Sequence, residues 1–127
     1  SVSSVRVIGT VKAGYNALAL EEDFGSAYAE VPNAEEYRYL IVKGDSMAPY
    51  IRDGDLALVH LQASLKNGDL GVVLYGDGEA TLKEYRYSDG AVTLVPFNSA
   101  YETVTLSGHE LERLMIFGRV VETKTKW

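Results

Sequence analysis

Cysteine is absent from the 127 residues of this sequence. The absence excludes a disulfide framework, a thiol nucleophile and a zinc site built on cysteine. It also fits a reducing compartment, where disulfides do not persist. We therefore expect a cytoplasmic protein.

Long apolar runs are absent as well. Because no stretch of about 18 apolar residues occurs, we expect no membrane-spanning helix. The opening residues, SVSSVRVIGT, lack the basic region and apolar stretch of a secretory signal. They also lack an initiator methionine, which suggests a trimmed chain or a piece of a longer one.

Basic residues are scarce. Lys and Arg number 12 against 18 Asp and Glu, which gives a formal net charge of −6. A DNA-binding surface needs clustered cations to displace counterions from the phosphates, and the sequence contains no such cluster. Nothing predicts a cofactor or a metal either, because Asp45, Asp53 and Asp55 each adjoin a glycine and are typical of turns.

Turn signals divide most of the chain into short segments. Gly-Asp or Asp-Gly pairs recur at positions 44–45, 53–55, 68–69, 76–78 and 89–90. Between them lie β-favouring runs at residues 37–42, 56–61, 70–75, 80–87, 91–95, 103–106 and 115–121. This spacing predicts a mostly β, strand-rich domain of short antiparallel strands with little helix. Two helical turns are expected, one beginning at Ser46 and one over residues 107–113.

The first third of the chain has a different composition. Residues 14–30, GYNALALEEDFGSAYAE, are small, acidic and aromatic with poor periodicity. We interpret them as an extended arm or hairpin rather than a core element. No Pro/Ser-rich linker interrupts the sequence, so we predict a single domain over residues 1–127, with an arm at 1–36 and a core at 37–127.

Ser46, in the segment VKGDSMAPYIRDGDL, is either a turn residue or a nucleophile that needs a base. The usual base is His, and the chain has two. His60 follows a strand pattern and is expected to be half buried, whereas His109 follows a glycine and is expected to be an exposed turn or cap. Neither forms a convincing triad with Ser46.

A neutral lysine is the other known base for serine. Free lysine has a pKa of about 10.4, and burial against apolar groups lowers this pKa by disfavouring the ammonium. Lys83, in EATLKEYRY, is a good candidate, since on a strand it shares one face with Thr81 and Tyr85. A lysine on such a polar face also fits a plain solvated position.

Four blocks of sequence occur in a specific order. They are VKGDSMAPYIRDGDLALV (42–59), NGDLGVVLYGDGEATLKEYRY (67–87), LVPFNSAYETVTL (94–106) and IFGRVVE (116–122). Together they resemble the peptidase S24 domain of the self-cleaving repressors typified by LexA and the phage CI repressors, which use a Ser-Lys dyad. The Gly-Asp-Ser-Met block alone also resembles type I signal peptidases, but a lysine 37 residues after Ser46 makes the match to the repressors more specific.

The resemblance implies roles for particular residues. Ser46 matches the nucleophile and Lys83 the general base of a serine peptidase. Met47 matches the residue after the nucleophile and is expected to lie at the cleft. Backbone N–H groups around Ser46 are expected to face the developing oxyanion.

The same resemblance implies a substrate within the chain. These repressors cut themselves at a small dipeptide, commonly Ala-Gly, and Ala13-Gly14 is the only such step in this sequence. Small residues let the scissile backbone enter a narrow cleft, and Val11 would fill an apolar subsite. The alternative is an ordinary glycine turn.

Partners also follow from the resemblance. We expect a homodimer, cleavage triggered by a RecA–single-stranded DNA filament, and operator DNA bound only through an N-terminal domain missing here. The C-terminal segment 114–127, LMIFGRVVETKTKW, is either a pairing edge or core. The sequence fits an SOS-response repressor and a prophage repressor equally.

Two other functions stay open. One is a non-cleaving dimerisation and regulatory module of the same fold. The other is a UmuD-like polymerase accessory subunit, although its typical Cys-Gly cut site has no counterpart in a chain without cysteine.

Overall fold

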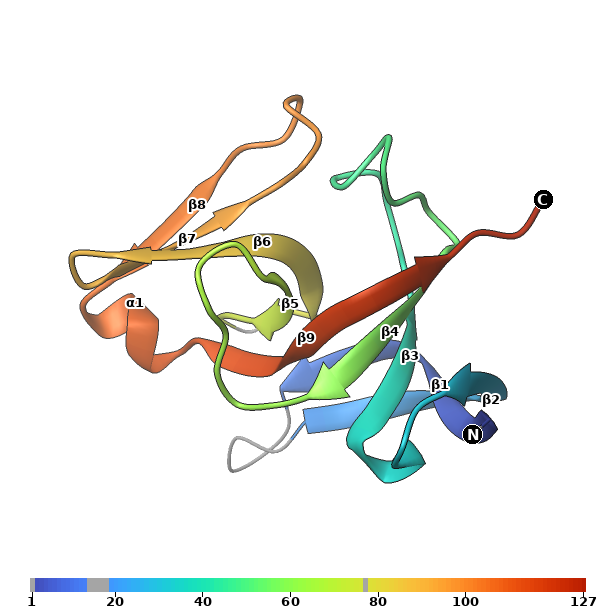
Figure 1. Ribbon diagram of the computed structural model, residues 1–127. Helices are drawn as coiled ribbons and strands as arrows, with labels where there is room; N and C mark the ends of the chain where they lie inside the picture. Colours follow the sequence, from blue (N-terminus) through green and yellow to red (C-terminus); the bar gives the residue numbers. More distant parts are fainter. Residues whose placement is uncertain (1, 14–18, 77) are drawn as a thin grey trace.

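The computed structural model describes residues 2–13, 19–76 and 78–127, and strands dominate it (Figure 1). The elements in chain order are β1 (Val2–Ala13), β2 (Ala19–Glu30), the 3-10 turn η2 (Ala34–Glu36), β3 (Tyr37–Ile41), β4 (Leu56–Leu61), β5 (Leu70–Leu74), β6 (Thr81–Ser88), β7 (Ala91–Val95), β8 (Val104–Ser107), α1 (His109–Glu112) and β9 (Met115–Lys124). The mostly β prediction is confirmed. Each of the seven predicted strands corresponds to one of β3 to β9, and the helical turn expected over 107–113 is α1.

The described strands form one sheet in the order β2-β1-β3-β4-β9-β5-β6-β7-β8. β1 and β3 run parallel, and all other neighbours are antiparallel. Strand β9, the last along the chain, lies in the middle of the sheet and joins β4 to β5. The C-terminal segment therefore closes the sheet between two halves that are separate in sequence (Figure 1).

Strand β9 pairs with β5 over residues 115–119 and with β4 over residues 118–124, and all of its buried residues lie within its first six positions. Phe117 and Val120 are buried, whereas Val121 is 40% exposed and Trp127 is fully exposed. Gly118 allows the close approach of β4, since a Cβ atom there would meet the His60 carbonyl oxygen at 2.3 Å. Segment 114–127 was interpreted as either a pairing edge or part of the core. The structure places Phe117 and Val120 of this segment in the core.

The N-terminal strand was not predicted, yet it contributes to the core. β1 pairs with β2, so the described part of residues 14–30 is one strand of a hairpin whose other strand is β1. The expectation that residues 14–30 contribute nothing to the core is wrong for Ala29, which is 4% exposed. Val5, Ile8 and Val11 of β1 are all 0% exposed. The division of the domain at residue 36 stays a prediction, and β1 shares its apolar contacts with strands on the other side of that division.

The largest apolar cluster lies beneath the segment that carries Ser46. Met47 and Ile51 of that segment pack with Leu82 of β6 and with buried residues of β1, β4, β5 and β9. Two further clusters form around Tyr39 and around Tyr85. The segment between β3 and β4 is thus fixed to the sheet by its own apolar side chains.

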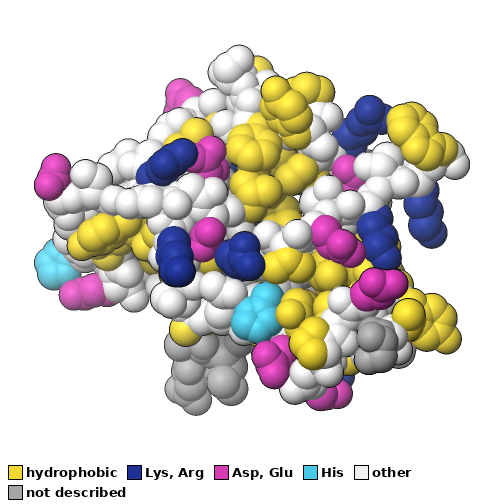
Figure 2. Space-filling model, in the orientation of Figure 1, with side chains coloured by type: hydrophobic (Ala, Val, Ile, Leu, Met, Phe, Trp, Pro, Cys, Tyr) yellow, Lys and Arg dark blue, Asp and Glu magenta, His cyan; other side chains and the backbone are white. Residues whose placement is uncertain are grey.

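The surface carries charge of both signs. On the face shown in Figure 2, Lys and Arg side chains are interspersed with Asp and Glu and do not gather into one basic region. No helix in the described part of the chain is long and apolar enough to cross a membrane.

Candidate active site

Ser46 lies in a series of turns between β3 and β4. The ends of this segment are held together, because Val42 N–H donates to the Asp55 carbonyl (2.8 Å) and Gly54 N–H donates to the Val42 carbonyl (2.7 Å). The short turn of helix predicted at Ser46 corresponds to consecutive hydrogen-bonded turns rather than a regular helix: Ala48 N–H donates to the Asp45 carbonyl and Ile51 N–H donates to the Met47 carbonyl, both at 3.1 Å. Pro49 has no N–H, so it cannot continue a helical hydrogen-bond pattern.

Met47 anchors Ser46 from the following position. It is only 2% exposed, and its Sδ accepts a hydrogen bond from Phe97 N–H at 3.4 Å. Because Met47 is buried in the large apolar cluster, the backbone at Ser46 has little freedom to move relative to the sheet. Met47 also lines the cleft next to Ser46.

Lys83 of β6 meets Ser46 directly. Its Nζ lies 3.0 Å from Ser46 Oγ, 2.6 Å from Thr81 Oγ1 and 3.1 Å from the Leu82 carbonyl oxygen. Burial lowers the pKa of Lys83 from its ordinary value of 10.5, because removal from water disfavours the charged amine. The structure thus brings together the two residues predicted for the dyad, in hydrogen-bond contact and with the lysine shifted toward its neutral form.

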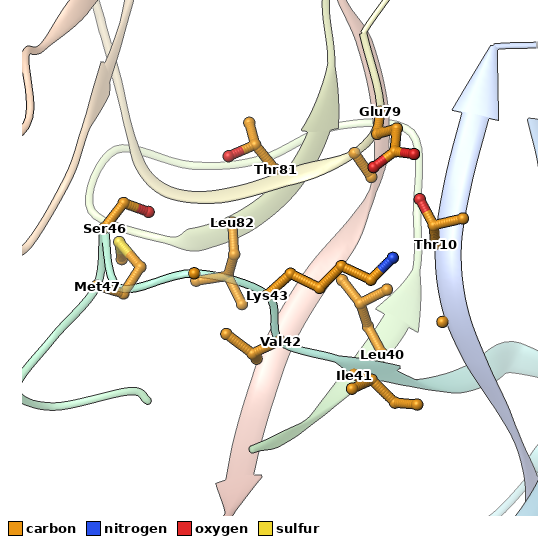
Figure 3. A pocket seen from close by; sticks show the side chains of 13 residues that line it. Thr10, Leu40, Ile41, Val42, Lys43, Ser46, Met47, Glu79, Thr81 and Leu82 are labelled. Carbon is orange, nitrogen blue, oxygen red and sulfur yellow. The ribbon is translucent and has the colours of Figure 1, made fainter. Parts of the chain in front are cut away.

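A cleft opens beside Ser46. Figure 3 shows Ser46 and Met47 on one side and Thr10 of β1 on the other, with Thr81 and Leu82 of β6 between them. Its walls come from β1, the end of β3, the Ser46 segment and the start of β6. Segments distant in sequence therefore form a groove that Ser46 helps to line.

Strand β1 leads from this cleft toward the predicted scissile bond. The Val11 carbonyl accepts a hydrogen bond of 2.7 Å from Ala80 N–H, just before β6 begins. Val11 itself is fully buried in the same cluster as Met47. Ala13 is the last residue of β1, and Gly14 lies outside the described residues, so the choice of Ala13-Gly14 stays a prediction.

The other candidate residues have ordinary structural roles. His60 is half buried, as predicted, and its ring nitrogens contact Gln62 and Glu36, while His109 is fully exposed. The Asp53 carboxylate accepts from Gly44 N–H at 2.7 Å, as expected of a turn aspartate. Asp55 is buried and accepts from Arg52 N–H and from the Thr125 hydroxyl.

Sequence reasoning missed a second loop at the site, between β7 and β8. Asn98 donates from its backbone N–H to the Ser46 carbonyl (2.9 Å) and from Nδ2 to the Asp45 carbonyl (3.0 Å). The Tyr101 hydroxyl donates a hydrogen bond to the Asp45 carboxylate. Asn98 also accepts from Ala100 N–H, a local bond typical of Asn in turns. A turn at this position could have been predicted from that residue type, but its contact with Ser46 could not.

Comparison with known proteins agrees with this geometry. The sequence model of the Peptidase S24-like family matches residues 6–121. LexA repressors from two strains of Cereibacter sphaeroides are 51% identical over 65 residues, which is 50% of this chain and 28% to 29% of theirs. The LexA repressor of Geotalea uraniireducens is 39% identical over 124 residues, which is 94% of this chain and 60% of that repressor. This chain thus spans less than two thirds of the length of these relatives. Because the family match covers most of the chain, the chain belongs to the Peptidase S24-like family.

Proposed function

We propose that this chain is the C-terminal regulatory domain of a transcriptional repressor, of SOS-response or prophage type, that inactivates itself by serine-lysine autoproteolysis at Ala13-Gly14. One observation carries the proposal: Lys83 Nζ lies 3.0 Å from Ser46 Oγ in a site whose burial lowers the pKa of the amine. A structural lysine would gain more from full hydration or from a carboxylate partner. The name LexA repressor, shared by the relatives, supports the same assignment.

The chemistry divides into two steps. In the first, neutral Lys83 takes the proton of Ser46 Oγ while Oγ attacks the Ala13 carbonyl carbon. The resulting oxyanion collapses, the bond from Ala13 to the Gly14 nitrogen breaks, and Lys83 returns its proton to that nitrogen. In the second, a water molecule loses a proton to Lys83 and attacks the acyl ester. Lys83 then gives that proton to Ser46 Oγ as it leaves, and the new carboxylic acid on Ala13 ionises.

Tethering makes such a reaction fast unless it is restrained, because the substrate is part of the same molecule. We infer that the rate is set by how often the bond from Ala13 to Gly14 enters the cleft, and that a partner selecting the docked state switches cleavage on. The family resemblance makes the RecA–single-stranded DNA filament that partner. Operator DNA is bound elsewhere in the repressor, since these 127 residues carry a net charge of −6.

The test is incubation of the purified chain at alkaline pH, where Lys83 loses its proton without help, followed by mass spectrometry. The proposal requires two products, residues 1–13 and 14–127. Ser46→Ala and Lys83→Ala should each leave the chain whole. Wild-type protein that stays intact would instead support a non-cleaving regulatory module, and a cut at another bond would refute Ala13-Gly14.

A further inference from the structure

Asn98 holds two consecutive backbone carbonyls at the nucleophile. Its backbone N–H donates to the Ser46 carbonyl at 2.9 Å, and its side-chain Nδ2 donates to the Asp45 carbonyl at 3.0 Å. The two peptide units that flank the Ser46 Cα atom are therefore both held by one residue of another loop, and the Asp45 carbonyl accepts a further bond from Ala48 N–H at 3.1 Å.

The geometry of the peptide bond determines where the opposite edges of these units point. In a trans peptide unit the C=O and the N–H point in opposite directions. The Asp45 carbonyl shares its unit with the Ser46 N–H, and the Ser46 carbonyl shares its unit with the Met47 N–H. Since both carbonyls point toward Asn98, both N–H groups point away from it.

These two N–H groups have no acceptor among the residues that the structure describes. Across residues 2–13, 19–76 and 78–127, neither Ser46 N–H nor Met47 N–H forms a hydrogen bond. A backbone N–H is a strong donor that is normally paired. The N–H groups of Lys43, Asp45, Tyr50 and Asp53 in the same described segment also lack an acceptor, but Asn98 contacts the carbonyl of none of their peptide units. Two adjacent donors beside the serine hydroxyl match what a developing oxyanion requires.

The orientation of the Asn98 amide is itself determined. Its Oδ1 accepts from Ala100 N–H at 3.0 Å, so Nδ2 is the atom that faces the Asp45 carbonyl. The Asn98 carbonyl also accepts from Tyr101 N–H at 3.0 Å, which closes the turn. Asn98 is thus held within its own loop before it contacts the Ser46 segment.

We propose that Asn98 is a positioning residue that aims the N–H groups of Ser46 and Met47 at the oxyanion. The inference rests on the proposed function. When Ser46 Oγ bonds to the scissile carbonyl carbon, the electron pair of the C=O bond moves to the oxygen, and these two N–H groups donate to it. Asn98 touches neither the substrate nor Lys83, so it alters the stability of the oxyanion and leaves the proton acceptor unchanged.

The pH dependence of self-cleavage separates this role from the role of the base. Asn98→Ala removes the donor to the Asp45 carbonyl and, unlike Asn98→Asp, adds no charge that would itself shift the pKa of Lys83. Loss of one oxyanion donor slows enzymes by about 10²- to 10³-fold, and loss of its alignment should slow the plateau rate at high pH by about tenfold or more. The midpoint of the pH profile should stay at the wild-type value. Tyr101→Phe is the matched control, since it removes a contact to the Asp45 side chain and leaves both carbonyls held; its plateau rate should change by less than about threefold.

A second readout keeps the inference independent of the scissile bond. A fluorophosphonate probe forms a bond from Ser46 Oγ to phosphorus with loss of fluoride, and its phosphoryl oxygen occupies the oxyanion position. Asn98→Asp and Asn98→Ala should both label at least about tenfold more slowly than wild type, at unchanged melting temperature. If the wild-type chain is labelled but does not cut itself, the proposed function fails. The ratio of variant to wild-type labelling rates still tests the role of Asn98. Labelling of the variants at the wild-type rate, or a pH midpoint that is shifted in Asn98→Ala, would overturn the inference. Slower labelling that is accompanied by a lowered melting temperature in both variants would overturn it as well. So would wild-type protein that is never labelled.

Discussion

Lys83 Nζ and Ser46 Oγ lie 3.0 Å apart, although 37 positions separate the two residues in the sequence. The contact depends on β6, which presents Lys83, and on a turn segment that Met47 ties to the apolar core. Thr81 and the Leu82 carbonyl also contact the amine, so Lys83 is positioned by its own strand before it reaches Ser46.

The rate of self-cleavage should rise with pH and then level off. Only the neutral amine can accept a proton from Ser46, and burial lowers the pKa of Lys83 from 10.5. A lowered pKa moves the rise to lower pH, so we expect the midpoint of the rate profile below 10.5. The check is a series of cleavage rates from neutral to strongly alkaline pH. A rate that still climbs through pH 10.5 with no plateau would contradict this expectation.

Thr81→Val should slow cleavage. Thr81 Oγ1 lies 2.6 Å from Lys83 Nζ, and without it the amine is free to leave its alignment with Ser46. We expect the plateau rate to fall by about ten- to a hundredfold, the scale of a small misplacement of a reacting group. Thr93→Val is the matched control, because the Thr93 hydroxyl bonds to the Thr105 hydroxyl at 3.4 Å on an exposed part of β7 and β8. Similar rates for both variants would show that Thr81 does not position the amine.

Met47→Ala should destabilise the fold as well as the site. Met47 is 2% exposed, and removal of a buried methionine side chain costs about 2–5 kcal/mol in the free energy of unfolding. Met47→Leu conserves volume and should cost less than about 1.5 kcal/mol. Urea denaturation of both variants, with Met115→Ala as the partly buried comparison, measures the difference. A Met47→Ala loss no larger than that of Met115→Ala would exclude Met47 as the anchor of the nucleophile segment.

Gly14→Val should abolish the cut between residues 13 and 14. A branched side chain next to the scissile bond would clash with a narrow cleft, whereas the smaller Gly14→Ala should only slow the reaction. Mass spectrometry after alkaline incubation distinguishes the two outcomes. Products of unchanged mass and rate from Gly14→Val would place the scissile bond elsewhere.

Local sequence patterns predicted seven strands because turn residues separate them clearly. Strand β1 escaped prediction because it does not alternate regularly. Its pairing with β2 shifts register between Arg6 and Ile8 and again between Ile8 and Val11. As a result Val5 and Val7 pack in one apolar cluster while Ile8 and Val11 pack in another, and a period of two is lost.

Local sequence patterns could not predict which strands pair when they are distant in the sequence. Nothing local in residues 115–124 indicates that β9 inserts between β4 and β5. The candidate site shows the same division. Ser46 and Lys83 were predicted through a family resemblance, whereas the contact of Asn98 with the Ser46 carbonyl depends on how two loops meet in space.

The most direct measurement is the NMR titration of the Lys83 side chain in the Ser46→Ala protein, which should stay whole at every pH. The lysine signals are followed at Cε with ¹³C labelling, and the Lys83 signal is identified by its absence from a Ser46→Ala/Lys83→Met protein. We predict a Lys83 midpoint clearly below 10.5, in agreement with the midpoint of the cleavage rate in the wild-type chain. A Lys83 that titrates at or above 10.5 would contradict its assignment as the base that activates Ser46.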